Sequence, residues 1–184
     1  MVLTVSDIRK YLSLNNVDDK DWSDDDLELL LNNKFEELQG LLGFDIVETS
    51  HKQYNRNYRG DTLILDYLNV LEIYEIQIDG GILGEDEYVL DENLGIIYFN
   101  KPQHGFIIIK YTCGLKDQEY NTLIKPLLLD MITYSVDNNP NKDATSIKEG
   151  DISITYDSTL VLGARINNRI KELRNQFSTK IRLL

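Results

Sequence analysis

Apolar residues recur every three or four positions in several stretches of the chain, and this period predicts helices. A short helix is expected around Ile8. A longer one follows Ser23, where Asp26 can form a near capping box and neighbouring aspartates suit the positive end of a helix. This second helix should end near Gly40 or Gly43. Its predicted apolar stripe consists of Leu27, Leu31, Phe35, Leu38 and Leu42.

Two further helices are predicted in the second half of the chain. Pro126 suits the first turn of a helix that runs to about Asp137. This helix is apolar on nearly every side, which predicts that it is buried. The last helix should begin near Ser158 or Thr159, and its apolar stripe is Leu162, Ile166, Ile170, Leu173 and Phe177.

Between residues 53 and 113 the pattern changes to the alternation that is typical of strands. Turn residues at 79–81 and 91–95 separate the apolar runs and favour antiparallel hairpins. A further strand or hairpin is expected over 147–156. The strands predicted in the main stretch are 62–66, 70–79, 88–90, 96–99 and 105–113.

The order of these elements predicts an α+β fold, because helices and strands are segregated along the chain and do not alternate. We expect a helical bundle of about four helices that carries an inserted antiparallel β-sheet subdomain. Residues 1–50 and 116–184 would build the bundle core, and residues 53–115 the inserted β subdomain.

The net charge of the chain limits which classes of partner it can bind. The chain has 31 acidic and 19 basic residues and a formal net charge of −12 at pH 7. Such a chain is a poor general binder of nucleic acid or of anionic membranes. Its apolar runs are also far shorter than the roughly 20 residues that a membrane-spanning helix needs. We therefore expect no membrane partner.

Little in the sequence indicates catalysis or metal binding. His51 and His104 are the only histidines, both are expected at the surface, and neither lies in a metal-ligand motif. Cys113 ends an apolar strand and is expected to be a buried structural residue. The acidic run starting at Asp19 departs from the EF-hand pattern, because its sixth position is Asp24 instead of glycine. We expect no enzyme activity, no cofactor and no metal.

The C-terminal end has the opposite charge. Residues 160–184 contain one acid, Glu172, and six basic residues, which gives a net charge of +5. A basic end on an acidic chain suggests head-to-tail self-association or docking on an acidic partner. The alternative is a solvated helix face with basic residues near the helix C-terminus.

Four stretches of sequence follow one another in an order that is typical of one family. They are helix 3–12 with an acidic spacer and helix 25–38, the strand end IKYTCGL at 109–115, Ile124-Lys125-Pro126 before an apolar helix, and EGDISITY at 149–156. Over most of its length the chain thus resembles the head–tail connector proteins of tailed bacteriophages and prophages, also called adaptor or head-completion proteins.

The resemblance implies a structural virion protein of the neck, assembled in the host cytoplasm. Such proteins form a ring, typically dodecameric, between portal and tail. They extend the DNA channel, through which DNA passes without sequence-specific binding, and they offer a docking surface to the tail or to a stopper protein. The implied partners are further copies of the chain, the portal protein and the tail or stopper protein.

The basic last helix and the tail beyond it are the candidate surface for contact with the portal or with a neighbouring subunit. An apolar tip with basic residues can become ordered on docking. The alternative is that Phe177 completes the core and the tail takes no part. The candidate residues are Arg165, Arg169, Lys171, Arg174, Phe177, Ile181, Arg182, Leu183 and Leu184.

Three other functions stay open at this stage. The chain could be another neck protein, such as a tail terminator. It could be a non-viral acidic module that binds a protein partner. It could also be a hydrolase that uses Asp61 or Asp66 near His51.

Overall fold

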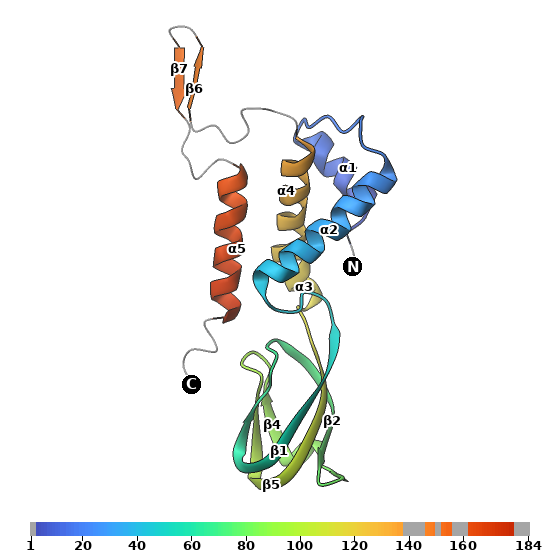
Figure 1. The fold of residues 1–184 in the computed structure, drawn as a ribbon, viewed down its shortest axis with the longest axis vertical. Helices are drawn as coiled ribbons and strands as arrows, with labels where there is room; N and C mark the ends of the chain where they lie inside the picture. The colour runs from blue at the N-terminus through green and yellow to red at the C-terminus, as the bar shows by residue number, and fades with distance from the viewer. Residues whose placement is uncertain (1–2, 138–145, 150–151, 156–161, 179–184) are drawn as a thin grey trace. The chain divides into compact units, whose positions relative to one another are not determined.

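The computed structural model describes residues 3–137, 146–149, 152–155 and 162–178. The chain divides into two compact units. The helical unit comprises residues 1–43 and 119–175, and the sheet unit comprises residues 44–118 and 176–184. Helices and an antiparallel sheet are segregated along the chain (Figure 1), which confirms the predicted α+β class.

The helical unit contains α1 (Val5–Leu14), α2 (Asp24–Leu42), α4 (Lys125–Val136) and most of α5 (Leu162–Ser178). The predicted capping box of α2 is present, since the Ser23 hydroxyl accepts from the Asp26 N–H and the Asp26 carboxylate accepts from the Ser23 N–H. The helix passes through Gly40 and ends at Gly43, whose φ of 74° lies in the left-handed region.

Pro126 lies in the first turn of α4, as predicted, but helical backbone also precedes it. Helical backbone starts with α3 (Asp117–Glu119) and continues through η2, a π-helical turn at Tyr120–Ile124, into α4. Proline cannot donate a backbone hydrogen bond, and its ring crowds the preceding turn of a regular α-helix. A wider π turn directly before Lys125 and Pro126 accommodates that ring, so α4 begins at these two residues although helical turns lead into it.

Helices α1, α2 and α4 pack on one another and bury the predicted apolar stripes. Helix α4 lies between α1 and α5 (Figure 1) and is buried on most sides, as its composition predicts. Leu31 and Phe35 of α2 are only half-buried. The fully buried residues of the three packed helices include Ile8, Leu12, Leu27, Leu38, Leu128 and Ile132.

A hairpin precedes α5. Its strands are β6 (Ser146–Glu149) and β7 (Ile152–Thr155), which pair antiparallel with Ile147 opposite Ile154. A strand or hairpin is therefore present within the expected range of 147–156, with β6 starting one residue earlier.

The sheet unit is built on one long central strand. The strands are β1 (Thr49–Ile64), β2 (Val70–Ile78), β3 (Gly81–Ile82), β4 (Tyr88–Asp91) and β5 (Ile96–Cys113). Their order is β1-β5-β2-β3, and β4 pairs with the first residues of β5 on the side opposite β1. A 3₁₀ turn, η1 (Glu85–Glu87), leads into β4.

Two of these strands are longer than the sequence predicts. Residues 96–99 and 105–113 form one strand, because β1 pairs across Pro102 and Gly105. Residues 49–61 belong to β1, although only 62–66 was expected to be a strand. This stretch is polar because β1 is an edge strand with one face in water, so it lacks the apolar alternation that identifies a buried strand.

Candidate functional site

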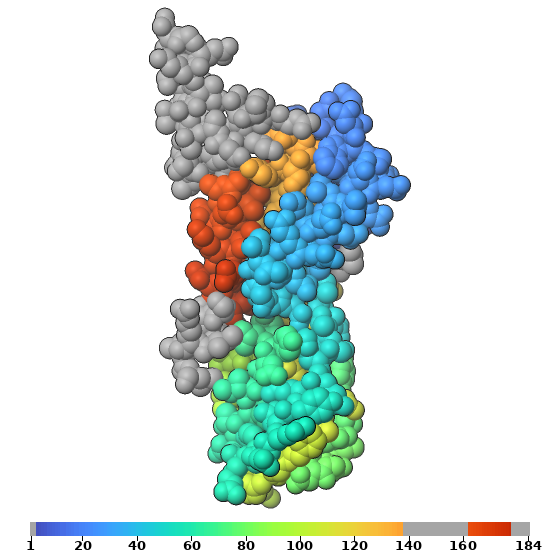
Figure 2. Space-filling model, in the orientation of Figure 1, coloured from blue at the N-terminus to red at the C-terminus, as the bar shows by residue number. Residues whose placement is uncertain are grey.

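Helix α5 has one buried apolar face and one basic face. Ile166, Ile170 and Leu173 are each at most 8% exposed, in agreement with the predicted stripe. Lys171 and Arg174 lie outside this stripe and are exposed. In Figure 2 the surface of α5 (red) borders that of α2 (blue). The sequence pattern therefore identified the buried face of this helix.

Arg165 is held by α4 through Asp130, which also binds α1. Its Nη2 lies 3.1 Å from Asp130 Oδ1 on α4, and the Tyr11 hydroxyl of α1 donates to the same oxygen at 2.8 Å. Burial and then the Asp130 carboxylate raise the pKa of Tyr11, so the hydroxyl keeps its proton. Arg165 is thus a tie between α5 and α4 as well as a surface cation.

The other candidate residues differ in accessibility. Arg169 forms an exposed ion pair with Glu172 at 3.2 Å. Phe177 is 3% exposed, and its ring centroid lies 4.9 Å from that of Phe44. Its contact with another subunit stays a prediction. The candidates Ile181, Arg182, Leu183 and Leu184 lie outside the described residues.

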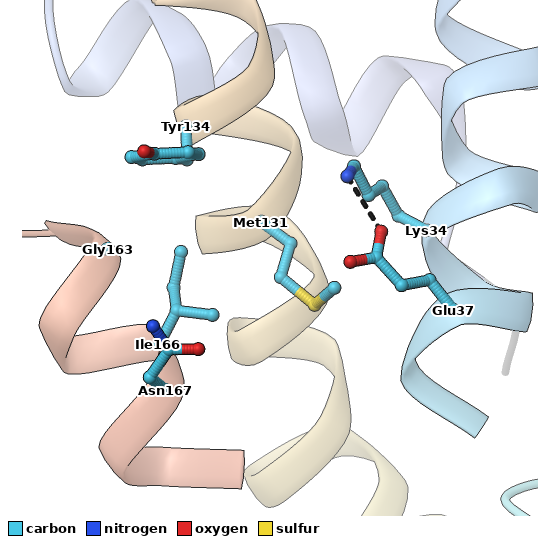
Figure 3. A pocket seen from close by; sticks show the side chains of 7 residues that line it. All are labelled: Lys34, Glu37, Met131, Tyr134, Gly163, Ile166 and Asn167. Carbon is cyan, nitrogen blue, oxygen red and sulfur yellow. Dashed lines mark hydrogen bonds and ion pairs between the residues drawn. The ribbon is translucent and has the colours of Figure 1, made fainter. Parts of the chain in front are cut away.

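A pocket of about 180 Å³ lies between α2, α4 and α5 (Figure 3). It is smaller than the roughly 300–1,000 Å³ of typical small-molecule sites. Its charged groups, Lys34 and Glu37, already form an ion pair at 2.7 Å. We therefore regard it as a packing gap beside α5. Its lining residues are Lys34, Glu37, Met131, Tyr134, Gly163, Ile166 and Asn167.

The expectation that His51 lies at the surface is wrong. Its Nε2 lies 2.6 Å from Asp45 Oδ2, and both side chains are 15% exposed. The Tyr67 ring stacks on the imidazole with centroids 3.7 Å apart. Asp45 lies six residues before His51 in the sequence. His51 is enclosed because the chain folds back at the start of β1. The expected partner of the hydrolase alternative was Asp61 or Asp66 instead.

Cys113 is buried, as predicted, with no exposed surface. Burial, and to a smaller extent Asp45, raise the pKa of its thiol to about 12. A thiol that stays protonated at neutral pH is a poor nucleophile. Among the described residues no cluster of three His, Cys, Asp or Glu side chains could hold a metal ion. Within the same residues no helix is long and apolar enough to cross a membrane.

One arrangement of charge in the sheet unit was missed by the sequence analysis. Strand β1 carries exposed Lys52, Arg56 and Arg59, whereas residues 70–92, which follow β2 through β4, contain eight acids and no base. Strand β5 separates the two groups. The absence of basic residues from 70–92 was a sequence signal for this charge separation. The separation itself could not be predicted, because the polar part of β1 was not recognised as a strand.

The fold resembles chains in solved structures of gene transfer agent (GTA) particles. A chain in "Neck of empty GTA particle computed with C6 symmetry" matches with TM-score 0.54 and 13% identity, covering 91% of this chain and 88% of that one. A chain in "Neck of native GTA particle computed with C12 symmetry" matches with TM-score 0.53 and 11% identity, covering 90% of this chain and 86% of that one. A chain in "Virion of native gene transfer agent (GTA) particle" matches with TM-score 0.53 and 14% identity, covering 90% of this chain and 88% of that one.

At these identities the likeness shows a shared fold, and it extends over both units of the chain. No protein-family model matches the sequence, and no curated protein sequence matches it significantly.

Proposed function

We propose that this chain is a structural, non-enzymatic neck protein of a tailed-phage-type particle. It forms a ring, most simply dodecameric, between portal and tail, extends the DNA channel and offers a docking surface to the next neck or tail protein. The observation that carries the proposal is the shared fold with neck chains, over about nine tenths of both partners, including a neck computed with C12 symmetry. The order of sequence motifs supports the same family independently.

The charge distribution suits such a ring. A closed ring is a head-to-tail assembly, in which each subunit needs two different complementary faces. Helix α2 begins with Asp24, Asp25 and Asp26, and α5 exposes Lys171 and Arg174. A net charge of −12 also suits a channel wall, since packaged DNA passes along it without adhering.

The proposal is tested by light scattering coupled to size-exclusion chromatography over a wide concentration range, with negative-stain imaging of the peak. We expect rings, either alone or on addition of a portal ring. A chain that remains monomeric and binds no portal ring would contradict the proposal.

The part played by α5 is tested by Lys171→Glu with Arg174→Glu. Both side chains are exposed and lie outside the buried stripe, so we expect loss of assembly or portal binding with an unchanged melting temperature. Arg165 is unsuitable for reversal, because a glutamate there would face Asp130. Lys10→Glu with Lys20→Glu gives a control with the same change in net charge on exposed sites of the helical unit. Unchanged assembly in the α5 variant would remove these residues from the interface.

A further inference from the structure

Strand β1 leaves one edge of the sheet open. It pairs with β5 along its length, and within the described residues no strand pairs with its other edge. Residues 49–55 pair with residues 107–113 in an unbroken register, and the first shift occurs only between Asn55 and Tyr58. A regular, unpaired strand edge is a template for contact with another chain.

This edge carries unneutralised positive charge. Lys52, Arg56 and Arg59 are exposed, and in the part of the chain that the structure describes none of them forms an ion pair with a carboxylate. The Lys52 ammonium lies 5.0 Å from the centroid of the Tyr54 ring. Tyr54 is itself 54% exposed, so the edge presents an aromatic surface between cations.

The other side of the sheet carries the opposite charge. Glu72 on β2 and Glu85, Asp86 and Glu87 in η1 are all exposed. Among the described strands, only the two-residue β3 covers the outer edge of β2, where it pairs at Gln77 and Ile78. Exposed apolar side chains flank the acids of η1 along the chain, at Ile82 on β3 and Val89 on β4, which are 73% and 62% exposed.

We infer that the basic β1 edge of one copy docks on the acidic β2–η1–β4 side of the next copy. The two faces lie on opposite sides of β5, so docking leaves both a free basic edge and a free acidic edge, and further copies add in the same sense until a ring closes. The apolar side chains form the centre of this contact and the charges its rim. This inference rests on the proposed function, and it places a subunit contact in the sheet unit in addition to the helical surfaces.

A second copy is the occupant that the charges favour. The exposed acids at 72 and 85–87 match a basic strand that every copy of the chain already carries. A duplex DNA partner for β1 is disfavoured, since these three cations lie in an acidic unit. Single exposed ion pairs contribute only about 0–1 kcal/mol, so several must act together, and association should weaken as salt increases.

The test uses three variants of the full chain. Lys52→Glu with Arg59→Glu reverses the basic edge, Glu85→Lys with Asp86→Lys reverses the acidic side, and the third variant carries all four changes. We expect each double variant to associate at least about tenfold more weakly than wild type. The fourfold variant should recover association, because glutamates on β1 then face lysines on η1. Lys10→Glu with Lys101→Glu is the control for net charge, and it should associate as wild type does.

A second measurement places the contact directly. A zero-length carbodiimide reagent joins Lys52 to a carboxylate only where the two groups touch, and mixing ¹⁴N and ¹⁵N chains separates links between copies from links within one. We expect a link between Lys52 of one copy and Glu85, Asp86 or Glu87 of another.

Three results would overturn the inference. If both charge-reversal variants form rings as wild type does, the proposed contact is wrong and the proposed neck function is unaffected. Salt-sensitive DNA binding that is lost in the β1 variant, with assembly unchanged, would assign the edge to DNA instead. A wild-type chain that neither associates nor cross-links, alone or on a portal ring, would overturn the contact, and binding to the portal ring itself would then decide the neck function separately.

Discussion

Asp79 and Phe106 form a reciprocal clamp across the sheet. The Asp79 N–H donates to the Phe106 carbonyl at 2.9 Å, and the Asp79 carboxylate accepts from the Phe106 N–H at 2.8 Å. The carboxylate can reach the backbone only because Gly105 has no side chain. With a φ of +117°, Gly105 also adopts a conformation that L residues rarely take. The clamp joins the end of β2 to β5 just beyond Pro102.

Gly105→Ala should therefore destabilise the sheet unit. An added methyl group would collide with the Asp79 carboxylate, and the backbone would be strained. We expect a loss of about 1–3 kcal/mol in the free energy of unfolding, measured by urea denaturation. Gly40→Ala is the matched control. Nothing lies within 4 Å of a methyl group there, in the interior of α2, so it should stabilise by about 0.5–1 kcal/mol. A neutral Gly105→Ala variant would show that the clamp can relax.

Gln53 is a buried polar residue whose side chain forms hydrogen bonds with backbone groups of the sheet unit. Its amide donates to the Ile64 carbonyl at 3.1 Å and accepts from the Asp66 N–H at 2.8 Å. Gln53→Ala would leave these partners without their bonds, so we expect a loss of about 1–3 kcal/mol on thermal or chemical unfolding. Gln103, whose amide bonds to an exposed backbone carbonyl, is the control and should tolerate alanine. Equal effects at both sites would contradict the role of Gln53.

The capping boxes of α1 and α2 should make stability depend on acid pH. The Thr4 N–H and then Lys125 lower the pKa of Asp7, and the Ser23 hydroxyl and then its N–H lower the pKa of Asp26, both from an ordinary 3.8. Carboxyls that are more acidic in the folded state stabilise it above the unfolded pKa. This contribution is lost as the pH falls below about 4.

Asn substitution at both positions should therefore flatten the dependence of helix stability on pH between about 6 and about 2, followed by circular dichroism. Asp25→Asn, in the same first turn of α2 but outside the capping boxes, should keep the wild-type dependence. Identical acid unfolding of the Asp7→Asn, Asp26→Asn variant and wild type would refute the assignment.

Cys113 should report on opening of the sheet unit. Its thiol is fully buried, and burial raises its pKa to about 12, so a thiol reagent should not label the folded protein at about pH 8. Labelling should begin only when denaturant opens the sheet. Ser50→Cys in a Cys113→Ala background gives an exposed control that should react at once. Rapid labelling of native wild type would mean that the end of β5 opens readily.

Much of the helical part was determined by the sequence alone. The stripe from Ile166 to Phe177 and the capping box at Ser23 depend on neighbours within one or two helical turns, so local pattern identified the helix, its buried face and its start. The same short-range pattern identified the exposed basic residues of α5. It could not show that Arg165 meets Asp130, because that contact joins residues 35 positions apart.

In the sheet unit the tertiary structure decided more. Strand β1 is polar between residues 49 and 61 and is held by its ladder to β5, a pairing between distant residues that no local pattern records. The enclosure of His51 by Asp45 and Tyr67, and the placing of Lys52 and Glu85 on opposite sides of β5, follow from that pairing. The sequence determined which residues are charged, and strand order decided on which side of the sheet each of them lies.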